Sequence, residues 1–335
     1  MKVSIVVPVY NVKDLVIKCL ESLHDQTLDD YEVIVVNDGS TDGSGELVDA
    51  FCADKEKFRV FHKENGGLMS AWMEGVSHAT GEYLGFVDSD DYVDVTMFEK
   101  LYACAAEYSC DIVMCDRYNV RGEQVIYDKV SIIDPGYYSA DTIHLIHERI
   151  LPAFSGSHIT NARWNKLFRR ELFMGNTKYC EHRSRICEDR FITPACVFSA
   201  KSFYYLSEPL YYYVLREGSN HSMPSPALQD VMEMLYANQK QMLRDKGLDT
   251  QYTSLVERAN LNYLRLMIMR NFAGKGDARL RKTLAKRILE SDEYRRLIKK
   301  YPNDMSGKLG KILRWLFIIK SPALFVGVCS FIRRS

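Results

Sequence analysis

The sequence lacks several features that would place it in a familiar class of protein. Its nine cysteines are odd in number and include no Cys-x-x-Cys pair, which fits a reducing compartment better than a disulfide framework. No Gly-x-Gly-x-x-Gly follows the first apolar run, which disfavours a dinucleotide-binding dehydrogenase. That run is also too short, and lacks the small-residue cleavage site, for a signal peptide. We therefore expect a cytoplasmic protein.

Net charge is absent too, but charges of opposite sign are separated along the chain. The 44 Lys and Arg residues balance 44 Asp and Glu residues. Residues 1–100 nevertheless carry a net charge of −12, and residues 241–335 carry +13. Phosphate backbones are held by Lys and Arg, so the acidic front half argues against a nucleic-acid partner. The basic rear half suggests an anionic surface.

Short apolar runs alternate with amphipathic segments near the start of the chain. We predict strands at 2–9, 31–38, 58–62 and 82–88, and helices at 12–23, 44–54 and 67–79. Near-continuous apolar strands between helices indicate an α/β fold whose mostly parallel central sheet has helices on both faces. Ligands of such sheets bind beyond the carboxyl ends of the strands. Further along, residues 226–301 predict two or three helices.

Acidic residues gather at these strand ends. Asp38 ends the second strand, where a carboxylate can accept hydrogen bonds from a ribose or a base edge, and residues 40–42 suit a turn and helix cap. Asp88, Asp90 and Asp91 follow the strand at 82–88. Because Asp88 and Asp90 share a side of an extended segment, their oxygens can converge on one divalent cation. Capping of the next helix is the alternative, and we assign Asp94 to it.

Five motifs in order make the chain resemble a family 2 glycosyltransferase of the GT-A fold. They are IVVPVYNV, VNDGSTDGS, NGGLMSAW, GEYLGFVDSDD and CEDRF, and they keep the family's spacing over residues 3 to about 222. The resemblance implies inverting transfer of a sugar from a UDP-sugar to an acceptor hydroxyl. It further implies work in bacterial surface-polysaccharide assembly, such as capsule or exopolysaccharide, on a lipid-linked saccharide.

The resemblance also implies roles for individual residues. The nucleotide sugar would be held by Pro8, Tyr10, Asn11, Asp38, Asn65, Asp88 and Arg216. A divalent metal, Mn²⁺ or Mg²⁺, would be held by Asp90, Asp88 and His221 and would offset charge on the departing diphosphate. Asp189 would be the catalytic base that takes the acceptor's proton. The acceptor would meet Trp164, Lys166 and Glu188, with core packing an equal alternative for Trp164.

One position departs from the family's pattern. Many members have Gly-Leu-Ser-x-Ala-Arg-Asn after the paired glycines, whereas this chain has Trp72 and Met73 at the Arg and Asn places. Trp supplies neither the charge nor the fork of a guanidinium. The arginine contact must come from elsewhere, with Arg216 as a candidate, or be absent. Trp72 also suits the buried face of its helix.

The C-terminal tail has its own character. Residues 307–335 hold six Lys and Arg and no acid, and Lys320, Ser321 and Pro322 split two apolar runs. Each run is too short to cross ~30 Å of hydrocarbon. Basic flanks and Trp315 suit a segment lying on the anionic inner face of the cell membrane, and a helix pair packed on the protein is the alternative.

The domain organisation follows from these segments. We predict a glycosyltransferase domain at 1–222, divided into a nucleotide-sugar half (1–117) and an acceptor half (118–222). A helical C-terminal region (223–305) and the basic amphipathic tail (306–335) follow. The rival function is a catalytically inactive nucleotide-sugar-binding or membrane scaffold protein of the same fold. A nucleotidyltransferase is disfavoured, because VPVYNVKDL is not a basic Gly-rich phosphate loop.

Overall fold

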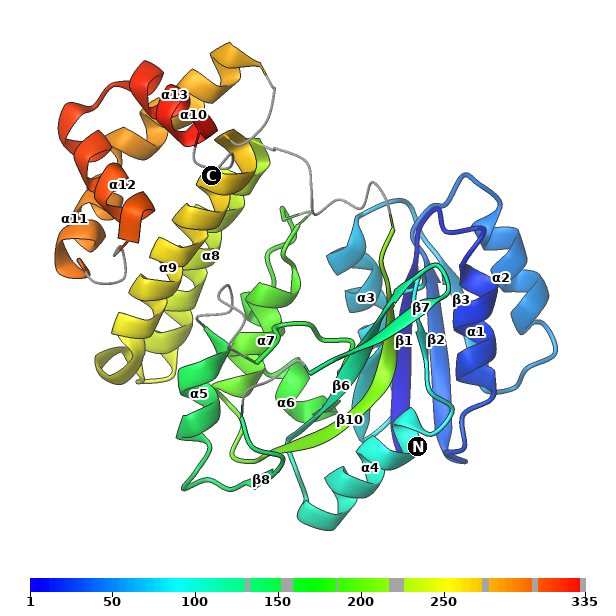
Figure 1. Ribbon diagram of the computed structural model, residues 1–335. Helices are drawn as coiled ribbons and strands as arrows, with labels where there is room; N and C mark the ends of the chain where they lie inside the picture. Colours follow the sequence, from blue (N-terminus) through cyan, green and yellow to red (C-terminus); the bar gives the residue numbers. More distant parts are fainter. Residues whose placement is uncertain are drawn as a thin grey trace. The chain divides into compact units, whose positions relative to one another are not determined.

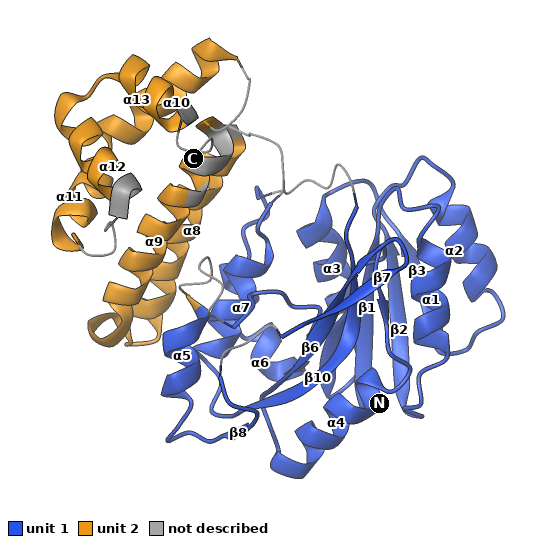
Figure 2. Ribbon diagram, viewed as in Figure 1, with its two compact units in different colours: residues 1–150, 157–217 blue, residues 151–156, 218–335 orange. Residues whose placement is uncertain are grey.

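The chain divides into two compact units (Figure 2). The computed structural model describes residues 1–129, 133–151, 159–184, 186–216, 226–272, 277–302 and 307–331. Unit 1 comprises residues 1–150 and 157–217, and unit 2 comprises residues 151–156 and 218–335. Unit 1 holds a sheet and its helices, and the regular elements described in unit 2 are all helices. The helices of 226–301 and those of the tail therefore belong to one unit.

The first half of unit 1 is a parallel sheet with helical crossovers (Figure 1). Its strands are β1 (Val3–Val9), β2 (Tyr31–Asn37), β3 (Phe58–His62) and β4 (Tyr83–Phe86), in the spatial order β3-β2-β1-β4. Its helices are α1 (Val16–His24), α2 (Ser44–Cys52) and α3 (Leu68–Ser77). Every residue of β1, β2 and β4 is buried, which explains their continuous apolar runs. The predicted α/β fold is confirmed.

The second half of unit 1 extends this sheet with strands of mixed direction. These are β5 (Tyr92–Val93), β6 (Ile112–Arg121), β7 (Gln124–Asp128), β8 (Gly136–Tyr138), β9 (Lys166–Arg169) and β10 (Phe203–Val214). β9 lies antiparallel between β4 and β6, and β10 then pairs parallel with β6. The helices here are α4 (Met97–Tyr108), α5 (His144–Ile150), α6 (Arg170–Met174) and α7 (Asp189–Val197), with a 3₁₀ turn at Thr177–Tyr179.

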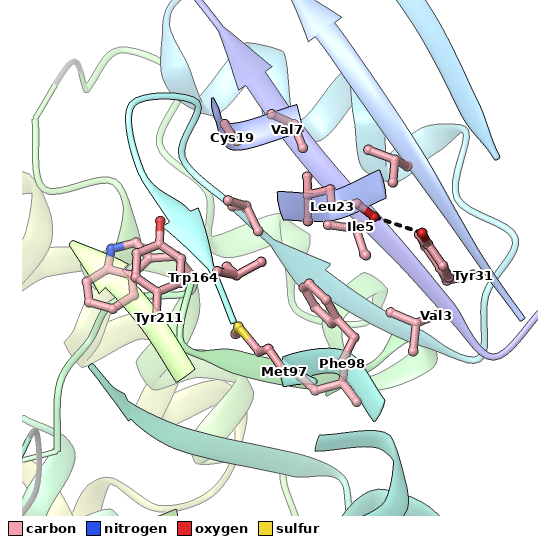
Figure 3. Packing of buried hydrophobic residues seen from close by; sticks show 14 of the residues in the cluster. Val3, Ile5, Val7, Cys19, Leu23, Tyr31, Met97, Phe98, Trp164 and Tyr211 are labelled. Carbon is pink, nitrogen blue, oxygen red and sulfur yellow. Dashed lines mark hydrogen bonds between the residues drawn. The ribbon is translucent and has the colours of Figure 1, made fainter. Parts of the chain in front are cut away.

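Alternate side chains of β1 face the two sides of the sheet. Val3, Ile5 and Val7 belong to a core shared with α1 and α4 (Figure 3). On the opposite side α3 lies so close that a Cβ on Gly75 would come 2.4 Å from the side chain of Val6. Glycine is therefore required at this crossing, and the central strand is buried on both faces.

Unit 2 contains more helices than its sequence pattern predicts. They are α8 (Pro226–Asp245), α9 (Asp249–Phe272), α10 (Ala278–Glu290), α11 (Asp292–Lys300), α12 (Gly307–Ile319) and α13 (Pro322–Phe331). Four of them lie within 226–301, where two or three were predicted. Capping explains the difference, because Asp277 accepts from the N–H of Arg279 and Ser291 accepts from that of Tyr294.

The tail forms two helices divided at the predicted position. α12 ends at Ile319, Lys320 takes a left-handed φ of 55°, and Pro322 opens α13. Within the described residues, no helix combines the length and the apolar character that a membrane span needs. Phe325 and Leu316 are buried, whereas the side chains of Trp315 and Ile318 are 48% and 78% exposed. The tail therefore packs with one face and leaves apolar side chains on another.

Candidate active site

The loops that follow β1 and β2 are fastened to each other. Asn11 has a φ of 51°, its backbone N–H donates to Ser40 Oγ at 3.1 Å, and its Oδ1 accepts from the N–H of Thr41 at 2.8 Å. Asp42 accepts from the N–H of Ser44 and fixes the predicted turn before α2, whose N-cap is Gly43. Tyr10 precedes Asn11 and stays 51% exposed. Its ring is thus free at the strand ends, next to a rigid turn.

Asp38 holds the loop that leads into α3. Its side chain is buried, Oδ1 accepts from the N–H of Gly66 at 2.9 Å, and Oδ2 accepts from the N–H of Gly67 at 2.8 Å. Lys63 Nζ donates to Oδ1 at 3.0 Å, and the Asn65 amide donates to the carbonyl oxygen of Asp38 at 3.0 Å. The structure thus gives Asp38 a loop-organising role. Contact of Asp38 and Asn65 with a nucleoside stays a prediction.

The acidic loop after β4 is fixed from β10. Asp91 is buried, and its carboxylate accepts from the hydroxyl of Tyr211 at 2.7 Å and from the N–H of Val214 at 2.8 Å. Burial raises the pKa of Asp91 well above its usual value. Asp94 accepts from the N–H of Thr96 at 2.9 Å and so fixes the turn before α4; the N-cap itself is Thr96, without a side-chain hydrogen bond, so the predicted capping role of Asp94 is corrected to a turn contact.

Asp88 and Asp90 remain at the surface of the site, and each contacts an arginine. Asp90 is ion-paired with Arg216, beyond the end of β10. Asp88 accepts from Arg163 at 2.9 Å. Their side chains are 24% and 26% exposed, so both are open to a ligand. The other metal-binding candidate, His221, lies outside the described residues.

Arg163 joins Asp88 to Asp189. Its guanidinium donates through Nη2 to Asp88 and through Nη1 to Asp189, the first residue of α7. The side chain of Arg163 is only 1% exposed, and Asp189 is 24% exposed. Sequence reasoning missed this residue, although the unfilled arginine place at position 72 was a signal to look for another. The structure therefore places the predicted base and the predicted donor-side carboxylate on one guanidinium.

Burial dominates the electrostatics of this group. The pKa of Asp88 is raised to about 7, chiefly by burial; Arg163 lowers it, and the charges of Asp189, Asp90 and Glu188 raise it. The pKa of Arg163 is itself raised, because the carboxylates outweigh its desolvation. The same neighbouring acids raise both pKa values. They favour the charged form of Arg163 and disfavour the charged form of Asp88. The cluster holds more negative charge than its arginines compensate.

Two predicted acceptor residues are corrected by the structure. Lys166 is fully buried, and its Nζ donates to the carbonyl oxygens of Thr160 and Ala162 at 2.8 and 2.7 Å and to Asn165 Oδ1 at 2.9 Å. Burial lowers the pKa of Lys166 to about 7, and the charges of Asp189 and Cys115 oppose this only in part. All three donors are used inside the protein, so Lys166 braces the turn that carries Arg163 and does not contact an acceptor.

Trp164 is the second correction. Its ring is 5% exposed and is stacked on the ring of Tyr211, with centroids 4.3 Å apart (Figure 3). Tyr213 lies 5.5 Å from the same ring. Because its ring is buried and stacked on two tyrosines, Trp164 is a packing residue, which was the alternative left open. Glu188 is also buried, next to Asp189 at the start of α7.

The donor set of the acidic loop fits a divalent cation that a substrate completes. Among the described residues, no group of three or more His, Cys, Asp and Glu side chains could hold a metal by itself. Asp88 and Asp90 are hard oxygen ligands with partly exposed side chains, and the cluster around Asp88 has excess negative charge. Mn²⁺ and Mg²⁺ commonly take one or two carboxylates and fill the remaining places with phosphate and water.

Comparison with known proteins assigns the family. The chain matches "Glycosyl transferase family 2" over residues 4–175. EpsJ of Bacillus subtilis, an uncharacterized glycosyltransferase, is 34% identical over 70% of this chain and 67% of its own length. EpsH of the same organism, a putative glycosyltransferase, is 33% identical over 63% of this chain and 60% of its own. YibD of Escherichia coli is 28% identical over 94% of this chain and 92% of its own.

Solved structures share the fold. Residues 1–349 of Staphylococcus aureus TarS superpose with a TM-score of 0.73 at 20% identity, covering 100% of this chain and 92% of that one. TarS has also been solved with UDP and with UDP-GlcNAc. The mannosyltransferase PcManGT of Pyrobaculum calidifontis, solved with GDP-Man and Mn²⁺, has a TM-score of 0.51 at 15% identity over 100% of this chain and 88% of its own. The chain belongs to glycosyl transferase family 2 and is a glycosyltransferase with the GT-A fold.

Proposed function

We propose that the protein transfers a sugar from a UDP-sugar to an acceptor hydroxyl with inversion, assisted by a divalent metal. One observation carries the proposal: Asp88, beside the metal-ligand candidate Asp90, and the base candidate Asp189 meet on the guanidinium of Arg163. This shared contact supports a single site for the donor-side and acceptor-side candidates. A binding module without catalysis has no need of a base there, which disfavours the scaffold alternative.

Each part of the site has a task in this reaction. Asp90, with Asp88, would hold a cation that stabilises negative charge on the departing diphosphate. Asp189 accepts the proton of the attacking hydroxyl, and attack opposite the nucleotide inverts the anomeric centre without a covalent enzyme intermediate. Tyr10, which is half-exposed, would stack on the nucleobase, with Pro8, Asn11, Asp38 and Asn65 around it. Arg216 would exchange its contact with Asp90 for the diphosphate.

Related proteins support the donor and the cofactor as classes. TarS has been solved with UDP and with UDP-GlcNAc, and PcManGT with GDP-Man and Mn²⁺. A further relative, 29% identical over 66% of this chain, is the poly(ribitol-phosphate) beta-glucosyltransferase of Bacillus spizizenii. These neighbours support a nucleotide-sugar donor, and the last supports a surface glycan as the acceptor; that this acceptor is linked to a lipid is our proposal.

We also propose that the tail places the enzyme on the anionic inner face of the cell membrane. Trp315 and Ile318 expose apolar surface on α12, and Lys311 and Lys320 are exposed near them. Apolar side chains flanked by lysines suit the interface of an anionic lipid leaflet. Such a position would suit an acceptor carried on a lipid.

The test is UDP release and binding in the full-length chain. UDP-GlcNAc, UDP-glucose and UDP-galactose are screened with Mn²⁺, with EDTA as the metal-free arm. We expect one donor to be hydrolysed only with metal. Asp90→Asn should lose the Mn²⁺-dependent thermal stabilisation by UDP, whereas Asp189→Asn should keep it and lose turnover. Asp94→Asn, whose side-chain oxygen can still accept from the N–H of Thr96, is the control and should behave as wild type. Wild-type turnover in Asp189→Asn would rule out the base.

A further inference from the structure

We propose that Arg163 is the positioning residue of the active site, which holds Asp189 in the orientation needed for proton abstraction and fixes it relative to Asp88. The inference rests on the proposed function, because it acts through the proposed base. It concerns a residue that takes no part in binding substrate. Arg163 is 1% exposed, whereas the two carboxylates that it holds are each 24% exposed.

The three residues come from distant parts of the chain. Asp88 follows β4, Arg163 precedes β9 and Asp189 opens α7. The two terminal nitrogens of one planar guanidinium contact one carboxylate each, Nη2 to Asp88 and Nη1 to Asp189. A guanidinium presents its donors in a fixed fork, so the two carboxylates are held at a set spacing. Arg163 supports them from the buried side and leaves their partly exposed oxygens for substrate.

Arg163 is itself held by rigid surroundings. Its guanidinium carbon lies 5.5 Å from the ring centroid of Trp72 and 5.7 Å from that of Phe86, within the range of cation–π contacts. Its Nε has no hydrogen-bond partner among the described residues. The turn below it is braced by Lys166, which donates to the carbonyl oxygen of Ala162.

A role in packing alone does not explain this arrangement. Burying a cation costs free energy unless the cation is paired. Replacing a buried ion pair by hydrophobic residues of similar volume often leaves the stability of a protein unchanged or higher. Without Arg163, Asp88 and Asp189 would face each other as uncompensated like charges in a partly buried site. One of them would then turn away or bind a proton. Either outcome removes a correctly placed base, so loss of Arg163 should mainly reduce kcat.

The expected kinetic signature separates positioning from binding. In Arg163→Met we expect kcat for Mn²⁺-dependent UDP release from the donor found in the screen to fall on the order of 100-fold. KM for that donor should change less than about fivefold, because neither Asp90 nor Arg216 is paired with Arg163. Arg163→Lys keeps the charge without the fork and should lose at least about tenfold in kcat. Arg169→Met, which removes an arginine paired with Glu82, is the matched control and should retain kcat.

A double-mutant comparison completes the test. If Arg163 acts through Asp189, then Arg163→Met together with Asp189→Asn should be no slower than Asp189→Asn alone. Multiplicative losses, or wild-type kcat in Arg163→Met, would overturn the inference. Should Arg163→Met fail to fold, Arg163→Lys decides, and wild-type kcat there overturns it equally. Wild-type kcat in Asp189→Asn would instead contradict the proposed base, so the two failures are distinguishable.

Discussion

The hydroxyl of Tyr211 donates a hydrogen bond of 2.7 Å to Asp91 and accepts one of 3.2 Å from the backbone N–H of Asp88. Tyr211 lies on β10, more than a hundred residues beyond the acidic loop. One phenol group therefore fixes both the backbone at Asp88 and the buried carboxylate of Asp91. The loop that carries the metal-ligand candidates is held in place by a distant strand.

Replacement of this hydroxyl tests its role. Tyr211→Phe leaves Asp91 buried with one donor fewer, so we expect the free energy of unfolding to fall by about 1–3 kcal/mol. Mn²⁺-dependent UDP binding, measured by calorimetry, should weaken several-fold because the loop loosens. Tyr205→Phe is the matched control, since its buried hydroxyl donates to Asp116 at 2.7 Å. Tyr205→Phe should lose a similar free energy of unfolding but keep its affinity for UDP. Equal weakening of UDP binding in Tyr205→Phe and Tyr211→Phe would contradict the prediction.

Lys166 gives a second prediction. Lys166→Met removes a buried ammonium and leaves its three oxygen acceptors without that donor. The free energy of unfolding should therefore fall by about 2–4 kcal/mol. Because the turn carrying Arg163 is then unsupported, UDP release should also slow. The measurements are urea unfolding and steady-state rates at a temperature where the variant is folded. Lys100→Met, which removes an exposed pair with Glu208, should change neither. An acceptor-binding role would instead raise only KM for the acceptor.

The imidazole of His147 predicts a pH dependence of stability. Burial lowers the pKa of His147 to about 4 from 6.5, and its Nε2 donates to the carbonyl oxygen of Val197 at 3.0 Å. The unfolded state binds the proton more readily, so this contribution is complete above pH 6.5 and is lost as pH falls toward 4. It amounts to about 3 kcal/mol. In urea unfolding at pH 7, 5.5 and 4.5, His147→Gln should show a shallower decline than wild type. Parallel declines would exclude His147 as the cause.

The tail predicts a membrane phenotype. Deleting residues 307–335 should release the protein from anionic liposomes in a sedimentation assay. Ile318→Asp should weaken binding without deletion, because it puts charge on a side chain that is 78% exposed. Ile126→Asp is the matched control, since Ile126 is 60% exposed on β7 in the other unit. Unchanged sedimentation of the deletion variant would remove the membrane proposal.

The sequence predicts local features of this protein well. The strand at 58–62 has the predicted bounds. The break at Lys320 was also visible in the sequence. Such features depend on residues within one or two turns of each other, so their pattern along the chain carries the information.

Side chains whose roles depend on distant neighbours are harder to predict. Trp164 and Lys166 were predicted to contact the acceptor, yet each is buried against partners that the sequence does not reveal. The same aromatic residue type can serve as a buried stacking partner or as an exposed platform for a sugar, so the residue type alone does not distinguish the two roles. Likewise, the residues that neighbour Arg163 in the sequence do not indicate whether its guanidinium lies at the surface or pairs with two carboxylates.

The sequence by itself determined the family, the α/β class and the strand ends at which acids gather, because periodicity and ordered motifs express these directly. Only the tertiary structure decided which charges meet. Asp88, Arg163 and Asp189 are separated by 75 and 26 residues, and folding brings them within hydrogen-bonding reach. Electrostatic contact depends on distance in space and on burial, and neither can be read from position along the chain.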